Sequence, residues 1–278
     1  MIYARSIGVA SLLPVIVLLS SSALGQGDVG VSNGKRNWSE EVDRQSSRFQ
    51  LFINDDEAVP LAVVKAYKWS NAARPILGDR LCLLYIHEGR PQASCKIYPD
   101  GQSITHVFIS MSPQELVCKQ EGDVVWTPPK CELGFKKIPG VEHPSTSVTR
   151  RQSEMKTIAR DFSSDMGKGE AQRQKANPGL RLLPTAIYRY EVTDSGADGV
   201  IDGAVFAFVA DGGNPEALLL LEAVRNGREL FWQYAFSRRS NAKLTGLHKG
   251  SKVWEVEFIP PSELGSNTGF HRLSRSVD

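Results

Sequence analysis

The chain has 278 residues, of which 41% are hydrophobic and 23% are charged, and its formal net charge is +2. The length allows one large domain or two small ones with a substantial buried core, and the composition is typical of globular proteins. The balanced charge excludes the electrostatic signature of a protein that binds nucleic acid or an anionic membrane surface.

The first 25 residues have the pattern of a secretory signal peptide. Arg5 precedes an apolar run from Ile7 to Leu19, and small residues lead to a cleavage-site pattern at Ala23-Leu24-Gly25. A membrane anchor is the alternative, but the apolar run is too short to span a bilayer. No later segment reaches that length, so we expect a secreted or periplasmic protein of the cell envelope, with no membrane association after signal cleavage.

The body of the chain is predicted to be a single β-rich domain over residues 59–258. Residues 26–58 are polar and rich in glycine, which predicts a disordered lead-in. Residues 259–278 follow Pro260-Pro261 and contain Ser, Asn and Gly, so we expect a disordered tail.

Residues 59–135 read as a first β segment because short apolar stretches alternate with turn residues. The spacing of about a dozen residues between strands indicates an antiparallel sheet. The expected strands are Pro60–Trp69, Leu81–His87, Ala93–Tyr98, His106–Met111 and Asp123–Trp126.

The four cysteines are candidates for disulfide bonds, because an exported protein enters an oxidising compartment. They are Cys82, Cys95, Cys118 and Cys131. If Glu88-Gly89 forms a two-residue turn, His87 pairs with Arg90, and counting back places Cys82 opposite Cys95. Three connectivities remain open. Zinc binding is disfavoured because the sequence has no Cys-x-x-Cys pair, and we expect no metal and no cofactor.

An amphipathic helix is predicted over residues 152–166, bridging the two β segments. Met155, Ile158, Ala159, Phe162 and Met166 recur at the spacing of one helical face. Gly167 follows where a helix stop is expected. The apolar stripe predicts that the helix packs across a sheet.

Residues 180–258 read as a second β segment, a meander of five strands. Its centre is the stretch Gly203–Val224, in which two apolar runs flank the turn residues from Asp211 to Pro215. The run Leu218–Leu221 also fits a buried helical piece, but the flanking strands favour β structure. The predicted fold class is therefore α+β and mostly β, with two antiparallel β segments and one bridging amphipathic helix.

Several short motifs between residues 60 and 258 resemble an uncharacterised family of predicted secreted bacterial proteins. The motifs are Lys68-Trp-Ser-Asn71, Glu88-Gly-Arg-Pro91 with Lys96-Ile-Tyr-Pro99, Ser110-Met-Ser112, Met155 to Phe162, Leu180-Arg-Leu-Leu-Pro184 with Tyr188-Arg-Tyr190, Asp202-Gly-Ala-Val-Phe-Ala-Phe208, Asn214-Pro-Glu216 to Glu222, and Trp232-Gln-Tyr234. The resemblance implies one continuous unit. It implies no activity, cofactor or active site.

Acidic side chains give two weak signals for chemistry. The stretch Asp194–Asp202 partly resembles a calcium-binding loop, although a polar turn explains the same residues. Glu216 and Glu222 could form a carboxylate pair, but on a strand they share a face and lie about 20 Å apart, too far for glycoside hydrolysis.

No catalytic residues are predicted, because the sequence lacks a nucleophile elbow, a Walker loop and a His-Glu-x-x-His motif. Four tryptophans could form a sugar-binding platform, although core packing is the more economical interpretation. They are Trp69, Trp126, Trp232 and Trp254. We expect a non-catalytic secreted or cell-envelope protein that binds a protein or polysaccharide partner and no nucleic acid. A secreted hydrolase of envelope polymers is the alternative.

Overall fold

The computed structural model describes residues 37–54, 59–70, 78–167, 179–192 and 199–277. The predicted signal peptide lies outside these ranges. The described chain is an α+β fold, mostly β, in which all strand pairs are antiparallel. Neither of its α-helices is long and apolar enough to cross a membrane.

Two of the three sheets are small. The five-stranded sheet has the order β17-β5-β4-β3-β2, and the three-stranded sheet has the order β1-β6-β7. Their strands are β1 (Phe49–Ile53), β2 (Ala62–Ser70), β3 (Asp79–His87), β4 (Arg90–Asp100), β5 (Ser103–Ser110), β6 (Leu116–Gln120), β7 (Asp123–Trp126) and β17 (Phe270–Ser276).

The third sheet is the largest, with the order β16-β15-β9-β10-β12-β13-β14-β8 and with β11 paired to β12. Its strands are β8 (Lys136–Lys137), β9 (Phe162–Met166), β10 (Gly179–Leu182), β11 (Tyr188–Arg189), β12 (Val200–Val209), β13 (Pro215–Asn226), β14 (Glu229–Arg238), β15 (Leu244–His248) and β16 (Ser251–Val256). Two α-helices, α1 (Trp38–Gln45) and α2 (Val148–Ala159), and the short 3₁₀ helix η3 (Pro261–Glu263) complete the fold.

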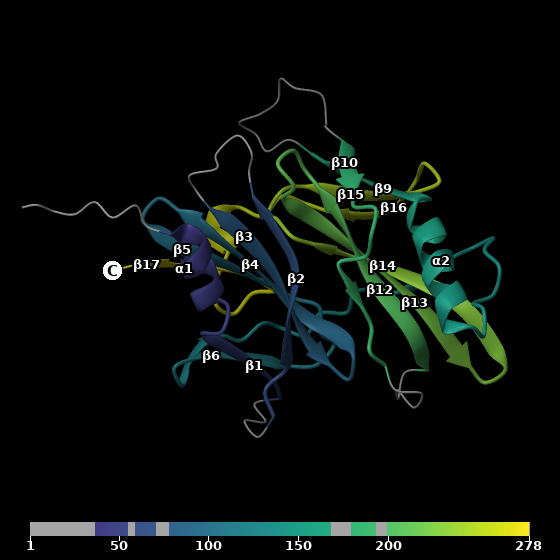
Figure 1. Cartoon of the computed structure of the whole chain (residues 1–278), viewed down its shortest axis with the longest axis horizontal. Coiled ribbons are helices and arrows are strands. Elements are labelled where there is room, and N and C mark those ends of the chain that lie inside the picture. The colour runs from purple at the N-terminus through teal and green to yellow at the C-terminus, as the bar shows by residue number, and fades with distance from the viewer. Residues whose placement is uncertain (1–36, 55–58, 71–77, 168–178, 193–198, 278) are drawn as a thin grey trace, which may run out of the picture. The chain divides into compact units, whose positions relative to one another are not determined.

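The five-stranded sheet is covered on one face by α1 and the three-stranded sheet. Alternate residues of β3, such as Leu83 and Tyr85, pack there with Val42 of α1 and Leu51 of β1. Figure 1 shows α1 lying beside β3 and β4. The alternation follows from the strand geometry, in which successive side chains point to opposite faces.

The nine-stranded sheet is buried on both faces along β12 and β13. The other face of β3 contributes Leu84, which packs with Val205, Leu218 and Leu220. On the far side, α2 packs across β12 and β13. The run Leu218–Leu221 is fully buried and lies within β13, so the prediction of a strand is confirmed.

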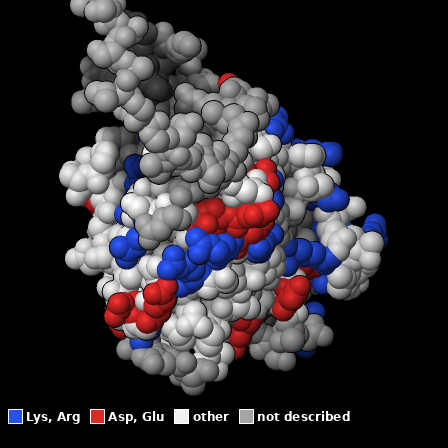
Figure 2. Space-filling view, turned by 60° about the vertical axis from the view of Figure 1, so that its left-hand side comes forward, with Lys and Arg blue, Asp and Glu red and all other residues white. Residues whose placement is uncertain are grey.

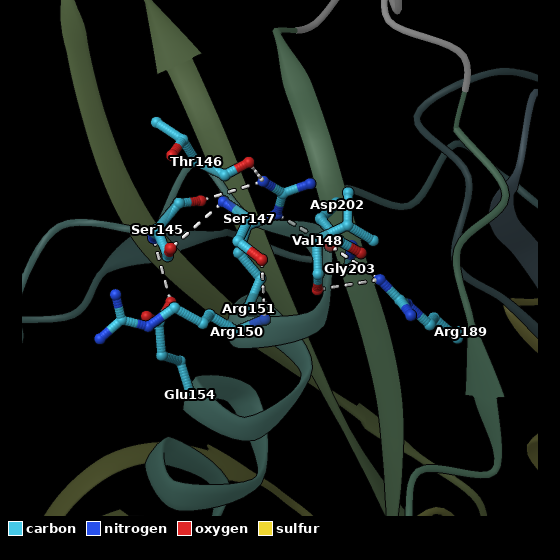
Figure 3. A network of polar contacts seen from close by, with 10 residues as sticks. All are labelled: Ser145, Thr146, Ser147, Val148, Arg150, Arg151, Glu154, Arg189, Asp202 and Gly203. Carbon is cyan, nitrogen blue, oxygen red and sulfur yellow. Dashed lines mark hydrogen bonds and ion pairs between the residues drawn. The ribbon is translucent and has the colours of Figure 1, made fainter.

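An ion-pair network joins the start of α2 to β12 (Figure 3). The buried carboxylate of Asp202 accepts hydrogen bonds from Nε of Arg151 at 2.9 Å, from Nη2 of Arg189 at 3.0 Å and from the backbone N–H of Gly203 at 2.9 Å. Arg151 also donates to the carbonyl oxygens of residues 145 and 146. Because the two buried charges of this network, Arg151 and Asp202, are paired with each other, the network fixes the helix against the sheet.

The predicted helix over 152–166 is right for residues 152–159 and wrong beyond them. Arg160 is the C-cap of α2, and residues 162–166 form β9. Phe162 and Met166 are four residues apart, so they satisfy the helical repeat as well as the two-residue repeat of a strand. The expected five-strand meander is right for β10, β12, β13 and β14, which are successive neighbours. It is wrong for the last expected strand, because β16 lies at the opposite end of the sheet from β14 and pairs with β15.

The chain ends are more ordered than predicted. Residues 37–54 of the expected lead-in contain α1 and β1, and residues 270–276 of the expected tail form β17. In both places a few apolar residues decide the outcome, since Val42, Phe49 and Phe270 are buried against the sheets.

The predicted disulfide bonds are not formed: all four cysteines are free, and Cys131 alone is not fully buried. The predicted turn is correct, because His87 pairs with Arg90, but a β-bulge between Tyr85 and Ile86 shifts the register by one residue. Lys96, one residue beyond Cys95, therefore lies opposite Cys82, and the two thiols are on opposite faces. Burial raises the pKa of Cys95, Cys118 and Cys131, which keeps these thiols protonated.

The buried His106 predicts sensitivity to acid. It is fully buried between Phe49 and Phe108, and burial lowers its pKa to about 4. The neutral ring contributes stability above pH 6.5, and this contribution is lost as the pH falls through about 4. The free energy of unfolding of the wild type should fall between pH 7 and pH 4. In His106→Phe this fall should be smaller by up to about 3 kcal/mol, as measured by urea denaturation.

The matched control is His87→Phe at an exposed position, which should keep the acid sensitivity of the wild type. His248 and His271 also have pKa values lowered by burial, so some acid sensitivity should remain in both variants. An unchanged pH dependence in His106→Phe would contradict the assignment.

Candidate functional site

A cavity of about 470 Å³ lies where the β3–β4 turn meets β12 and β13. We call it the Glu222 cavity. Its lining combines carboxylate, amide and guanidinium groups with apolar side chains, a mixture typical of ligand sites. The described residues that line it include His87, Glu88, Arg90, Gln92, Met111, Gln114, Cys131, Glu132, Phe135, Tyr190, Leu220 and Glu222.

The carboxylate of Glu222 is the polar centre of this cavity. Arg90 donates from Nη2 to Oε1 at 2.9 Å and to Oε2 at 3.2 Å, and from Nε to Oε1 at 3.1 Å. Gln233 of the neighbouring strand donates from Nε2 to Oε2 at 2.7 Å. Both carboxylate oxygens are therefore held in place by charge-assisted bonds. The bonds from Arg90 of β4 cross between the two large sheets, and the bond from Gln233 of β14 lies within the nine-stranded sheet.

Burial raises the pKa of Glu222, whose side chain has no exposed surface, although Arg90 and Gln233 act in the opposite direction. Burial also raises the pKa of Tyr190 well above 10, with the nearby Glu222 carboxylate as the next cause. The phenol therefore stays protonated and can serve only as a neutral hydrogen-bonding group.

Two glycines allow close contacts beside Glu222, one within the nine-stranded sheet and one between the sheets. A Cβ atom on Gly203, the cross-strand neighbour of Glu222, would lie 2.5 Å from Cδ2 of Tyr190. A Cβ atom on Gly89 would lie 2.4 Å from the carbonyl oxygen of Glu191, and Gly89 has φ of +78°. The carbonyl of Gly89 in turn accepts a hydrogen bond from the Tyr188 hydroxyl at 3.0 Å.

The two sequence-predicted carboxylates lie at opposite ends of one buried face. Glu216 and Glu222 both belong to β13 and are both buried, with Leu218 and Leu220 between them on the same face. Because six residues of strand span about 20 Å, the structure keeps them as separate sites.

The other sequence candidates have structural roles. Trp69, Trp126 and Trp232 are buried, which confirms core packing for these three, and the partly buried Trp254 stacks on Phe236 at 5.2 Å. Residues 194–198 of the calcium-like stretch lie outside the described residues. Asp202, its last member, is occupied by two arginines. Within the described ranges no group of three His, Cys, Asp or Glu side chains could hold a metal ion.

Arg90, Tyr190 and Gln233 were missed by the sequence analysis. Arg90 is 132 residues from Glu222, so their ion pair depends on how two sheets pack. A weak signal was present, because Glu222 directly follows the apolar run Leu218–Leu221 and a buried carboxylate needs a partner.

Comparison with protein family models, with curated proteins and with solved structures found no match. The arrangement of residues in the Glu222 cavity is therefore the basis for the function proposed below.

Replacing Arg90 by methionine should destabilise the protein most near neutral pH. The change leaves the buried Glu222 carboxylate without its cation, which costs about 3 kcal/mol or more in unfolding free energy. The pKa of Glu222, already raised by burial, should rise further in this variant. As the pH falls toward 4.5, Glu222 takes up a proton and the buried charge disappears, so the loss of unfolding free energy becomes smaller. Urea denaturation at pH 4.5 and pH 7.5 measures this difference.

The control for this experiment is Arg272→Met. Arg272 pairs with Asp100 at 2.7 Å on the surface, so its loss should cost below about 1 kcal/mol at either pH. The double variant Arg90→Met/Glu222→Leu should recover most of the stability, since it removes both charges. Equal losses at both pH values in Arg90→Met would argue against an important ion pair.

Gly203→Ala should displace Tyr190 from the wall of the Glu222 cavity. The added methyl group overlaps the ring, and such overpacking costs about 1–3 kcal/mol. Gly269→Ala is the control, because nothing lies within 4 Å of the added Cβ. Equal unfolding midpoints for the two variants would contradict the close contact.

Proposed function

We propose that this chain is a non-catalytic secreted or cell-envelope protein that binds a protein or polysaccharide partner through the Glu222 cavity. The observation that carries the proposal is the state of the Glu222 carboxylate. Both its oxygens are bonded to Arg90 and Gln233, which leaves a rigid polar wall and no free nucleophile. Preorganised polar groups of this kind fix the orientation of a bound ligand.

The lining of the cavity suits a partner with many hydroxyl or amide groups. Gln92, Gln114 and Glu132 offer hydrogen-bond donors and acceptors, while Met111 and Phe135 provide apolar surface. Sugars and peptide segments both present this mixture. On the face drawn in Figure 2, basic side chains are flanked by acidic ones, so their charges partly offset each other.

The N-terminal pattern supports export, as does the resemblance to predicted secreted bacterial proteins. A signal-like segment at residues 1–25 is the basis for placing the protein in the periplasm, at the cell envelope or outside the cell.

A hydrolase of envelope polymers is the second candidate. The raised pKa of Glu222 suits a general acid, and Glu88 and Glu132 line the same cavity. Glycoside hydrolysis commonly uses two carboxyl groups on either side of the scissile bond, one of which acts as the acid.

A panel of immobilised peptidoglycan fragments, capsular oligosaccharides and peptides can test binding. We expect the wild type to bind at least one class, and Gln114→Trp, which narrows the cavity with a larger side chain, to lose that binding. Gln102→Trp places the same bulk in the exposed β4–β5 turn and should bind like the wild type. Equal binding by all three proteins would refute a role for the cavity.

The same panel separates the two candidates when released products are followed by mass spectrometry. Product release that disappears in Glu222→Gln would favour the hydrolase, and binding without product release would favour the non-catalytic protein.

A further inference from the structure

A second polar cluster lies at the other end of β13, and its positive charges have no carboxylate partner. Arg239 has no exposed surface and Lys96 is 8% exposed. Among the residues that the structure describes, no carboxylate lies within 4.0 Å of the charged nitrogens of Arg239, Lys96 or Arg80. Buried cations normally have an anionic partner, as Arg151 does in this protein.

The partners that Arg239 does have are weak ones. Its Nη1 donates to Oγ of Ser94 and its Nη2 lies 3.5 Å from Sγ of Cys82, while its Nε is buried without a partner. The guanidinium therefore keeps most of its positive charge uncompensated next to β3 and β4.

The charge of Arg239 acts on Lys96. Its Nζ reaches Oδ1 of Asn214 at 3.5 Å and lies 5.7 Å from the centre of the Tyr98 ring. Burial lowers the pKa of Lys96 to about 8; Glu216 opposes this, and Arg239 adds to it. The side chain of Glu216 is itself bonded to Asn214.

Lys96 borders a cavity of about 400 Å³ between the five-stranded sheet and the β12–β13 turn. We call it the Lys96 cavity. Arg80 also lines it, and its Nε is buried without a partner. The lining residues are Arg80, Lys96, Tyr98, Pro99, Asp100, Gly101 and Asn214.

We propose that the Lys96 cavity binds an oxyanion, a phosphate or carboxylate group, held by Lys96 and Arg80 with Asn214 as a further donor. The anion would be the ion-pair partner that Lys96 and Arg80 do not have among the described residues. The buried positive charge of Arg239 would attract the anion as well. Asp100 at the rim is neutralised by Arg272 at 2.7 Å. Tyr98 and Pro99 form an apolar wall that fits the body of an organic ligand, such as a sugar ring that bears the anionic group.

This site is separate from the Glu222 cavity, so its test does not depend on the proposed function. Isothermal titration at pH 7 and constant ionic strength measures the binding of inorganic phosphate, glucose 6-phosphate, glucuronate and glucose. We expect at least one of the three anionic probes to bind and glucose not to bind. Glucose 6-phosphate and glucuronate distinguish a phosphate from a carboxylate as the preferred group.

Lys96→Met and Arg80→Met should each weaken that binding about tenfold or more, because each removes a charged hydrogen-bond donor. Lys156→Met removes one positive charge at an exposed position on α2 and should leave the affinity unchanged. Lys96→Met should fold, because it replaces a buried charge, which is costly, by an apolar side chain. A thermal melt checks that the variant is folded. Arg80→Met provides the same test if Lys96→Met does not fold.

Two outcomes would overturn the proposal. One is the absence of binding by all three anions. The other is an affinity in folded Lys96→Met and Arg80→Met equal to that of Lys156→Met.

Discussion

The burial of β13 on both faces is the constraint on which the rest of this structure depends. One face packs against α2 together with neighbouring strands, and the other packs against the five-stranded sheet. A strand without a solvent face carries an almost continuous apolar sequence, as Leu218–Leu221 does. Its few charged residues must then find partners in the facing layer, and this requirement creates the polar sites of the protein.

Those sites lie at the two ends of the contact between β4 and β13. Arg90 of β4 meets Glu222 at one end, and Lys96 of β4 lies near Glu216 and Asn214 at the other. The two ends differ in charge balance. At Glu222 the carboxylate is matched by an arginine, whereas at Lys96 the cations outnumber the acids. The Glu222–Arg90 pair therefore carries no net charge, whereas the cations at the second end attract negative charge.

Local patterns in the sequence were sufficient for the strands but not for their arrangement. The alternation along β3 and the turn at Glu88-Gly89 are encoded by neighbouring residues, so they could be predicted. The bulge beside Tyr85 adds one residue to β4, and no local signal marked it, so the facing partner of Cys82 was misjudged.

The candidate site was harder to predict because its residues meet only through packing between sheets. Glu216 and Glu222 could be assigned to one face of a strand, but the arginine opposite Glu222 comes from another sheet. The end of α2 and the position of β9 were predicted wrongly for a related reason. Phe162 and Met166 fit the helical repeat and the strand repeat equally well, and only tertiary contacts decide between them.

The position of β17 has a consequence for how the chain folds. This strand completes the five-stranded sheet by pairing with β5, yet the whole nine-stranded sheet lies between Ser110 and Phe270 in the sequence. Contacts of such long range close slowly, because a large loop must be ordered first. Until residues 270–276 arrive, β5 presents an open sheet edge that can pair with another molecule, so slow synthesis or truncation near residue 270 exposes the protein to aggregation.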